Sequence, residues 1–488
     1  MPEDATAPSP PARGQPETAA FVFPEPPPVV GRVATLLRAF GPGAIIASVS
    51  IASGETIFAA RGGAIFGYRL LWLVLLAGVL KGLMIYSAAH YAVVAGQNPL
   101  VRWCEIPGPR AWPAWFILLT CFLLGPFALA GLSKMLSSFL FWTFAGAGQA
   151  DAHPQAVARL GVAVLLAFAG VAIVSHYRFL EIAEKMLVGL LMVFVLIALF
   201  AASPDWLAAL RHLLLPLPPR YDAWVKELYP AIAAKRPILE VATYFGVVGG
   251  TLPDYVAYLA FLREKGWGRL AAAPPVNGGP GRHAAVEPAD AARARAWLRL
   301  PRLDVIASFA CVTVFTLSFM ILGAAILNPE RAVPDGFALL EKQSVFLTRL
   351  HPALLYVYQL GIFAAFGGTL YAAYEVQVRS VHESLCAIAP RRRWRLGRVR
   401  LWFYLWAIAA TAPIILTGLD PVRIYTPWSL LAGTLALGLW CLAMAWTDRR
   451  FLPPPLALVP AVWIGTLIAG IVMTALGIVS ITGYFASL

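Results

Sequence analysis

The sequence predicts an all-α polytopic membrane protein whose helices cross the bilayer eleven times. Hydrophobic residues make up 60% of the 488 residues and charged residues only 13%, whereas a soluble domain carries about 25% charged residues. The mean hydropathy is +0.73. Eleven stretches approach the length of about 20 apolar residues that a crossing requires. Two of them are interrupted near their centres by glycine or proline and a carboxylate.

Basic residues orient the predicted spans. Cytoplasmic loops of membrane proteins carry an excess of Lys and Arg. We therefore place the basic segments 263–302 and 391–400 in the cytoplasm. Alternation then puts the N-terminus in the cytoplasm and the C-terminus outside, with the long and also basic loop 204–237 outside, where the rule weighs less. We expect a multi-pass protein of a bacterial inner (plasma) membrane. The spans are expected near 41–65, 69–95, 113–143, 156–175, 183–202, 238–262, 303–327, 352–385, 401–418, 426–447 and 457–482.

Two segments lack the pattern of a packed domain. Residues 1–38 are rich in Pro and Ala and have no positive start followed by an apolar run, so we predict a disordered cytoplasmic tail instead of a signal peptide. Residues 272–290 are predicted to be a disordered cytoplasmic insertion, and 39–488 to form one transmembrane domain. The net charge of +13 follows from the cytoplasmic loops, because no nucleic-acid-binding pattern accompanies it. The five cysteines show no spacing typical of disulfides or metal sites. The sequence shows no catalytic or cofactor motif, so we expect a protein that is not an enzyme and has no cofactor.

The sixth span carries the clearest interruption, YFGVVGGTLPDYVAYLA from Tyr244 to Ala260. Pro253 and the glycines destabilise a helix here, and a break at membrane depth survives only where protein or water covers its carbonyl groups. Asp254 is a candidate site residue because a carboxylate inside a membrane is costly. The alternative is a simple kink, with Asp254 reaching toward an interface.

The first span is interrupted in a comparable place. It reads GPGAIIASVSIASGETIF from Gly41 to Phe58, with Ser50, Ser53, Gly54, Glu55 and Thr56 near its centre. Two interrupted spans separated by four intact ones are typical of secondary transporters built from inverted repeats, which bind the substrate where the two breaks meet. The sequence therefore predicts a substrate cavity lined by Glu55 and Asp254.

Motifs along the chain resemble a known family. After the GPG start come FGYRLLW, RFLEIAEKMLVGLLMVF, VVGGTLPDY and WTDRRF. In this order they are similar to the Nramp (natural resistance-associated macrophage protein) divalent metal transporters, over most of residues 40–482. The resemblance implies the LeuT-like (APC-type) transporter fold, with helices one and six broken. Inverted five-helix repeats would occupy 41–202 and 238–447, and an extra helix 457–482.

The resemblance also implies a substrate-binding set, which consists of Ala52, Ser53, Glu55, Thr56, Gly249, Thr251, Leu252 and Asp254. This chain departs from the family where the metal binds. Ala52 stands for the family's Asp, Glu55 for its Asn and Leu252 for its Met, and Asp254 replaces a His. Loss of the thioether favours hard ions such as Mg or Mn over Cd. Glu55 and Asp254 remain as candidate metal ligands.

Lys81 lies near the centre of the second span, where a lysine has no short route to water and must find a partner. Glu55 is the first candidate, and Glu375 in the eighth span is the second, either as a counter-charge of the site or in a purely structural pair. Lys134 is expected to extend toward the outer interface. An ammonium group beside the site would replace a coupling cation and repel a divalent metal.

The working function is therefore secondary-active transport of a divalent cation through an altered site. One alternative is a carrier of an organic or amino-acid-like solute, which would use the helix breaks and the hydroxyl groups of Ser50, Ser53, Thr56 and Thr251 as donors. A lesser alternative is a non-transporting membrane sensor, which would need a soluble domain that the short loops do not provide. The expected partners are a small cation or solute and the lipid bilayer, and the oligomeric state stays open.

Overall fold

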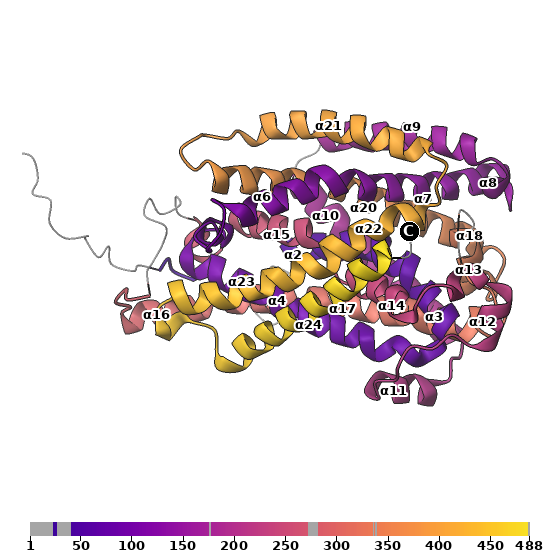
Figure 1. Cartoon of the computed structure of the whole chain (residues 1–488), viewed down its shortest axis with the longest axis horizontal. Helices are drawn as coiled ribbons and strands as arrows, with labels where there is room; N and C mark the ends of the chain where they lie inside the picture. The colour runs from indigo at the N-terminus through magenta and orange to yellow at the C-terminus, as the bar shows by residue number, and fades with distance from the viewer. Residues whose placement is uncertain are drawn as a thin grey trace, which may run out of the picture.

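The computed structural model describes residues 23–26, 41–174, 177–271, 282–334, 336 and 339–486, and every regular element in this part of the chain is a helix (Figure 1). Helices occupy all the predicted spans: α2 (Pro42–Ser50), η1 (Ile51–Ala59) and α3 (Ala60–Phe66); α4 (Leu71–Ala95); α6 (Trp112–Leu119), η3 (Thr120–Leu124) and α7 (Gly125–Ala145); α9 (Pro154–Val174); α10 (Tyr177–Ala201); α14 (Pro237–Val247) and α15 (Leu252–Glu264); α17 (Arg299–Leu322) and η5 (Gly323–Leu327); α20 (Leu354–Ile388); α21 (Leu396–Leu416); α22 (Pro421–Leu430), η7 (Leu431–Leu435) and α23 (Ala436–Phe451); α24 (Pro460–Phe485).

Shorter helices connect these spans or flank them. They are η2 (Gly67–Leu70), α5 (Leu100–Trp103), α8 (Gln149–Ala152), α11 (Trp206–Leu214), α12 (Ala223–Leu228), α13 (Pro230–Ala233), η4 (Gly268–Ala271), α16 (Pro288–Trp297), α18 (Leu339–Gln343), α19 (Val345–Thr348) and η8 (Pro454–Leu456). Proline occupies the first turn of α2, α14, α15, α22 and α24. A helix begins readily there because the first N–H groups have no partner within the helix.

The count of eleven crossings is not confirmed. Within the described residues, eight helices are long and apolar enough to cross a membrane, or nine when the segments Gly189–Ala201 and Trp206–Leu214, bent by 118°, are taken as one span. The predicted first and sixth spans are not among the eight. The sixth span is divided into the short helices α14 and α15, whose separate lengths do not reach a full crossing.

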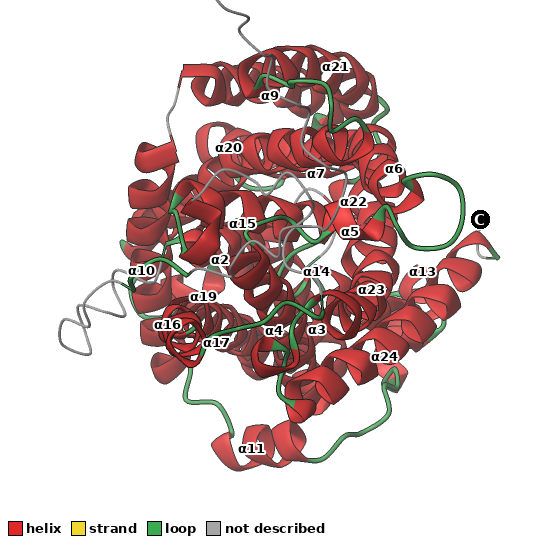
Figure 2. Ribbon diagram, turned by 90° about the vertical axis from the view of Figure 1, so that its left-hand side faces the viewer, coloured by secondary structure: helices red, strands yellow, loops and turns green. Residues whose placement is uncertain are grey.

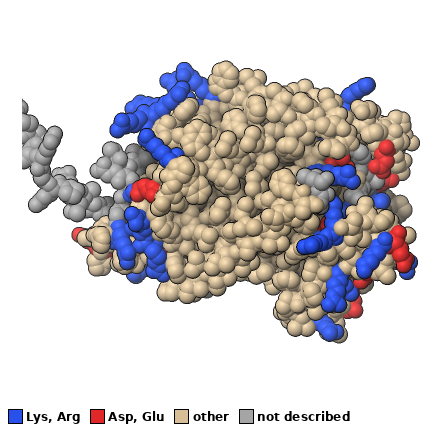
Figure 3. All heavy atoms as spheres, viewed as in Figure 1, with Lys and Arg blue, Asp and Glu red and all other residues tan. Residues whose placement is uncertain are grey.

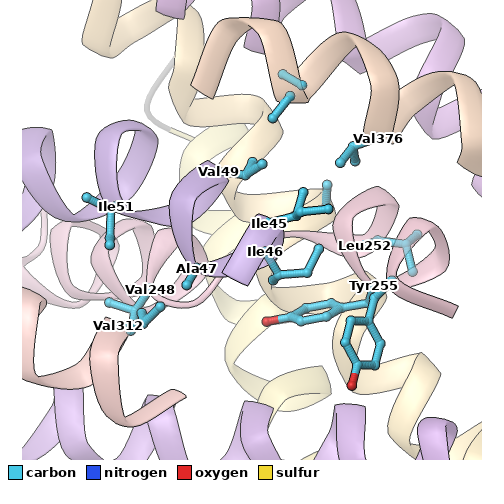
Figure 4. Close-up of a cluster of buried hydrophobic side chains, with 14 of the residues drawn as sticks. Ile45, Ile46, Ala47, Val49, Ile51, Val248, Leu252, Tyr255, Val312 and Val376 are labelled. Carbon is cyan, nitrogen blue, oxygen red and sulfur yellow. The ribbon is translucent and has the colours of Figure 1, made fainter. Parts of the chain in front are cut away.

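The interrupted helices lie in the interior of the bundle. Viewed from the end of the molecule, α2, α14 and α15 are surrounded by other helices, with α9 and α21 at one edge and α11 at the opposite edge (Figure 2). All nine residues of α2 are buried, and α2 packs against α10, α17 and α20. Apolar side chains of α2, including Ile45 and Ile46, lie near Leu252 and Tyr255 of α15 (Figure 4).

The outer surface is that of a multi-pass membrane protein. Lys, Arg, Asp and Glu gather at the two ends of the molecule, and the visible middle is almost free of charge (Figure 3). Large apolar side chains are exposed on the outer helices, for example Ile464, Ile468 and Ile471 of α24. Such a band is stable in contact with lipid and would be an unusually large apolar patch in water.

Both segments predicted to be disordered contain residues that make specific contacts. Phe23 is only 2% exposed, and its N–H donates to Asp290 at 2.9 Å. Glu25 pairs with Arg293 of α16 at 3.1 Å. Residues 23–26 thus contact α16, which begins at Pro288 inside the predicted insertion, and the division of the chain into a tail, an insertion and a transmembrane domain stays a prediction. The rest of the predicted tail and the first residues of the predicted insertion lie outside the described part of the chain.

Candidate functional site

Helix six breaks where the sequence predicts. α14 ends at Val247 and α15 begins at Leu252. Between them Gly249 and Gly250 have φ angles of 79° and 100°, a region that glycine adopts at little cost. Pro253 lies in the first turn of α15, where its missing N–H removes no helical hydrogen bond. The glycines and the proline thus produce a true gap in the helix and expose backbone groups at its centre.

Helix one is interrupted differently. Ile51–Ala59 forms a π-helix between α2 and α3. The chain therefore remains helical, but its backbone hydrogen bonds join residues five apart and not four. The Thr56 hydroxyl donates to the carbonyl oxygen of Ile51 at 2.8 Å, and Ser50 donates to Ile46 at 2.8 Å. The side chains of Ala52 and Ser53 lie outside the described set. Single π-helical turns are frequent at functional sites, so the predicted interruption takes this form instead of an extended gap.

The ammonium group of Lys81 fills the break in helix six. It donates to the carbonyl oxygens of Gly246, Val248 and Gly250 at 3.0, 2.6 and 3.0 Å, and Lys81 is 0% exposed. A lysine has three N–H donors, so these carbonyl groups satisfy the ammonium completely. The direct partner of Lys81 is therefore backbone, where the sequence predicted a carboxylate.

Two buried carboxylates flank the same break. Glu55 Oε1 accepts the N–H of Gly249 at 2.9 Å, whereas its Oε2 is buried and has no hydrogen-bond partner among the described residues. Asp254 Oδ2 accepts from the N–H and the hydroxyl of Thr251 at 2.6 and 2.7 Å and so caps α15. Glu55 and Asp254 are also the two charges that act on Lys81. One ammonium and two carboxylates therefore share the centre of the bundle.

The predicted site residues make further contacts. Gly249 accepts a hydrogen bond from the Tyr255 hydroxyl at its carbonyl oxygen, and the carbonyl oxygen of Thr56 accepts from Gln343 at 2.8 Å. Leu252 lines a small apolar pocket with Trp103 of α5 and with apolar side chains of α6 and α23. Leu252 thus packs into the core.

Glu375 is not the partner of Lys81. Its carboxylate accepts from Arg400 at 2.9 Å and from the Tyr404 hydroxyl at 2.7 Å, and it pairs with Arg379 one helical turn away. Arg379 in turn pairs with Glu264 at the end of α15 at 3.0 Å. The prediction of Glu375 as a counter-charge to Lys81 is therefore wrong. The spacing of four residues between Glu375 and Arg379 was the signal for this pair.

Sequence reasoning also missed the anchor of helix one. Asp304 of α17 accepts the N–H of Gly41 at 3.2 Å and of Gly43 at 3.0 Å, and the Tyr258 hydroxyl donates to it at 2.9 Å. A methyl group on Gly43 would lie 1.9 Å from Ser308 Oγ. The glycines of the GPG start therefore allow α2 to contact α17 closely, which fixes the helix that carries Glu55.

The described residues form no metal centre from side chains alone. Among the residues that the structure describes, no group of three or more His, Cys, Asp or Glu could hold a metal ion. An ion at the break would therefore depend on Glu55, Asp254 and backbone carbonyl oxygens. This donor set suits hard cations such as Mg, Ca or Mn.

This chain is similar to known proteins over most of its length. The model of the family described as "Natural resistance-associated macrophage protein-like" (Nramp) matches residues 43–483. The chain is 28% identical over 226 residues to the divalent metal cation transporter MntH of Caldanaerobacter subterraneus subsp. tengcongensis, which covers 46% of this chain and 47% of the relative. It is 30% identical over 231 residues to MntH of Burkholderia ambifaria, with 46% of each protein covered. The matches thus span about half the length of these relatives.

Solved structures extend the likeness to the whole fold. A mutant of the Eremococcus coleocola manganese transporter aligns with a TM-score of 0.68 at 16% identity, covering 96% of this chain and 91% of that chain. MhsT in complex with L-phenylalanine aligns with a TM-score of 0.54 at 12% identity, covering 93% and 98%. These likenesses establish a LeuT-like transporter fold. Because the family model spans most of the sequence, this chain belongs to the Nramp family.

Proposed function

We propose that this protein is a secondary-active carrier of a hard divalent cation. The observation that carries the proposal is the break in helix six, where three carbonyl oxygens surround a fixed cation, the ammonium of Lys81, beside the buried carboxylates Glu55 and Asp254. Relatives named as divalent metal and manganese transporters support a metal cargo. A donor set of carboxylate and carbonyl oxygens favours Mg or Mn over Cd.

Charge balance indicates how the cation binds. With Glu55 and Asp254 both ionised and Lys81 protonated, the cluster has a net charge of minus one. A divalent ion added to it would make the cluster net positive. Removal of the ammonium from the carbonyl oxygens would leave two negative charges and oxygen donors for a divalent ion. We therefore expect Lys81 and the ion to compete for the break, and the apparent affinity for the ion to be low because three hydrogen bonds must first open.

A carrier of a non-metal solute is the second candidate. The ammonium group of Lys81 already donates to the carbonyl oxygens of the break, so these oxygens have a cationic partner without a metal. Glu55 Oε2, which has no hydrogen-bond partner in the described part of the chain, could accept an N–H group from an amine-bearing solute. The fold is compatible with such cargo, because MhsT is described in complex with L-phenylalanine.

The proposal includes the membrane topology and the repeats. We place the N-terminus in the cytoplasm and the C-terminus outside, because the basic segments 263–302 and 391–400 are then both cytoplasmic. Helices within 41–202 and 238–447 would form the inverted repeats, with the segment 457–482 as an additional helix. The two interruptions at corresponding places support this division.

Uptake into proteoliposomes tests the cargo. The panel contains Mn, Mg, Ca, Cd, protons and amino acids, and compares the parent with Glu55→Gln and a control. Asp448→Asn is a matched control because Asp448 is also buried, at the far end of α23. We expect Mn or Mg uptake that Glu55→Gln abolishes and Asp448→Asn preserves. Uptake of an amino acid without any divalent cation would replace the first candidate with the second, and no uptake of any member of the panel would contradict both.

A further inference from the structure

A basic groove lies between α23 and α24, and none of its lining residues belongs to the break in helix six. It has a volume of about 780 Å³ and is lined by Arg282, Trp446, Arg449, Arg450, Trp463 and Leu467, among others. Three of these side chains are guanidinium groups from two separate segments of the chain. The groove therefore combines a concentrated positive charge with apolar and aromatic walls.

Aromatic rings support two of the arginines. The guanidinium carbon of Arg449 lies 4.8 Å from the centre of the Trp463 ring, and that ring is itself fixed by a hydrogen bond from its Nε1 to the carbonyl oxygen of Ala445 at 2.9 Å. Arg450 lies 5.4 Å from the ring of Trp446. Stacking restricts the side chains while their N–H groups remain available. The groove thus presents its charge in a pre-organised form.

Little negative charge opposes these arginines. Asp448 lies 3.9 Å from Arg449, but it is 1% exposed and its Oδ1 accepts the N–H of Leu458 at 2.9 Å. A buried carboxylate directed at the backbone balances one guanidinium at most. The groove keeps a net positive charge and complements an anion.

The position of the groove indicates which anion. Basic side chains gather at the end of the molecule where α16 and α23 lie (Figure 3), which is the cytoplasmic end in the proposed topology. Ile464 and Ile468 of α24, near the groove, are 49% and 50% exposed and belong to the apolar band. Tryptophan is typical of the boundary between head groups and hydrocarbon. The groove therefore lies where a phospholipid would have its head group beside the arginines and its acyl chains beside α24.

We propose that this groove binds the head group of an anionic phospholipid of the inner leaflet. Basic pockets between transmembrane helices on the cytoplasmic side are suited to such head groups. A free phosphate ion would use the charge alone and gain nothing from the apolar wall that continues along α24. The proposal is independent of the cargo, because the groove shares no residue with the cluster around Lys81.

Lipid binding by the full-length protein tests the proposal. The protein is reconstituted in nanodiscs of phosphatidylcholine and phosphatidylglycerol, and the lipid retained after extraction is measured by native mass spectrometry. We expect the parent to retain phosphatidylglycerol, and Arg449→Gln with Arg450→Gln to weaken retention about 30-fold, because each arginine near a membrane surface contributes about 1 kcal/mol, or roughly fivefold. Arg393→Gln with Arg398→Gln is the matched control, since it removes the same charge from exposed positions outside the groove.

The results of these measurements distinguish lipid binding in the groove from the alternatives. Equal retention by the groove variant and the parent, or equal loss in the control pair, would overturn the proposal. Displacement of the lipid by millimolar inorganic phosphate would show that the groove binds phosphate without the lipid, and would overturn it too. Photo-crosslinking of parent protein with a photoactivatable phosphatidylglycerol provides a readout that needs no variant. Crosslinks in the segment 442–467, which contains the groove residues of α23 and α24, support the proposal, and crosslinks confined to α21 contradict it.

Discussion

Replacement of Lys81 by Met tests the electrostatics of the helix-six break most directly. Met keeps an apolar stem of similar length and removes the ammonium from the carbonyl oxygens of Gly246, Val248 and Gly250. Hydrogen bonds to charged groups contribute about 1.5–3 kcal/mol each, so a simple sum would reach about 9 kcal/mol. That sum is too large, because removal of the lysine also removes the cost of burying its charge. The loss of one member of a buried charged cluster typically costs about 3–5 kcal/mol, which we take as the expected destabilisation.

Divalent cations should restore part of the lost stability. The variant keeps Glu55 and Asp254 beside three free carbonyl oxygens, so a hard ion can bind without displacing an ammonium. An ion at 100 times its dissociation constant stabilises the folded state by about 2.7 kcal/mol. The assay is thermal unfolding of the purified variant and parent in detergent during titration with Mg, Mn and Ca. We expect a steep ion dependence in the variant and a shallow one in the parent.

Lys134→Met is the matched control. Lys134 is the other lysine with 0% exposure among the described residues, and it donates to the carbonyl oxygen of Leu419 in the loop between α21 and α22. Its loss should destabilise the protein without creating ion dependence. If Lys81→Met unfolds at the parent's temperature, and neither ion binding nor transport differs from the parent, the ammonium does not balance the site and the reasoning is refuted.

Three further variants examine other contacts. Leu252→Met should leave Cd binding unchanged, because position 252 faces an apolar pocket, and a clear gain in Cd affinity by calorimetry would contradict that geometry. Gly43→Ala should cost about 1–3 kcal/mol by overpacking, because its methyl group would lie 1.9 Å from a side-chain oxygen of α17. The control Gly189→Ala, with no atom within 4 Å, should be neutral or stabilising by up to about 1 kcal/mol in a thermal melt. Glu375→Gln should cost about 3–5 kcal/mol because the buried cluster loses the carboxylate that Arg379 and Arg400 share, while Arg379 keeps its pair with Glu264. Glu330→Gln, which affects an exposed pair, should cost about 0–1 kcal/mol in the same melt.

The location of the break could be predicted because its causes are local. Gly249 and Gly250 tolerate positive φ angles and Pro253 favours a helix start, so the residues themselves determine where α14 ends and α15 begins. The form of the interruption in helix one could not be predicted in the same way. Gly54 and Thr56 weaken a regular α-helix but do not distinguish an extended gap from the observed π-helix. That choice depends on packing against α17 and α20, which a single sequence does not reveal.

The partner of Lys81 could not be predicted because the break itself supplies the partners. Sequence reasoning paired the ammonium with a carboxylate, yet an ammonium donates only and a carboxylate accepts only, so each can instead satisfy the opposite groups of an open backbone. Lys81 takes the carbonyl oxygens of the break and Glu55 takes the N–H of Gly249. The two charges therefore act on each other across a shared stretch of backbone. A divalent ion would have to replace the ammonium at the carbonyl oxygens, whereas an amine-bearing solute would engage Glu55 and leave Lys81 in place. Competition with Lys81 is thus the property that separates the two proposed cargoes.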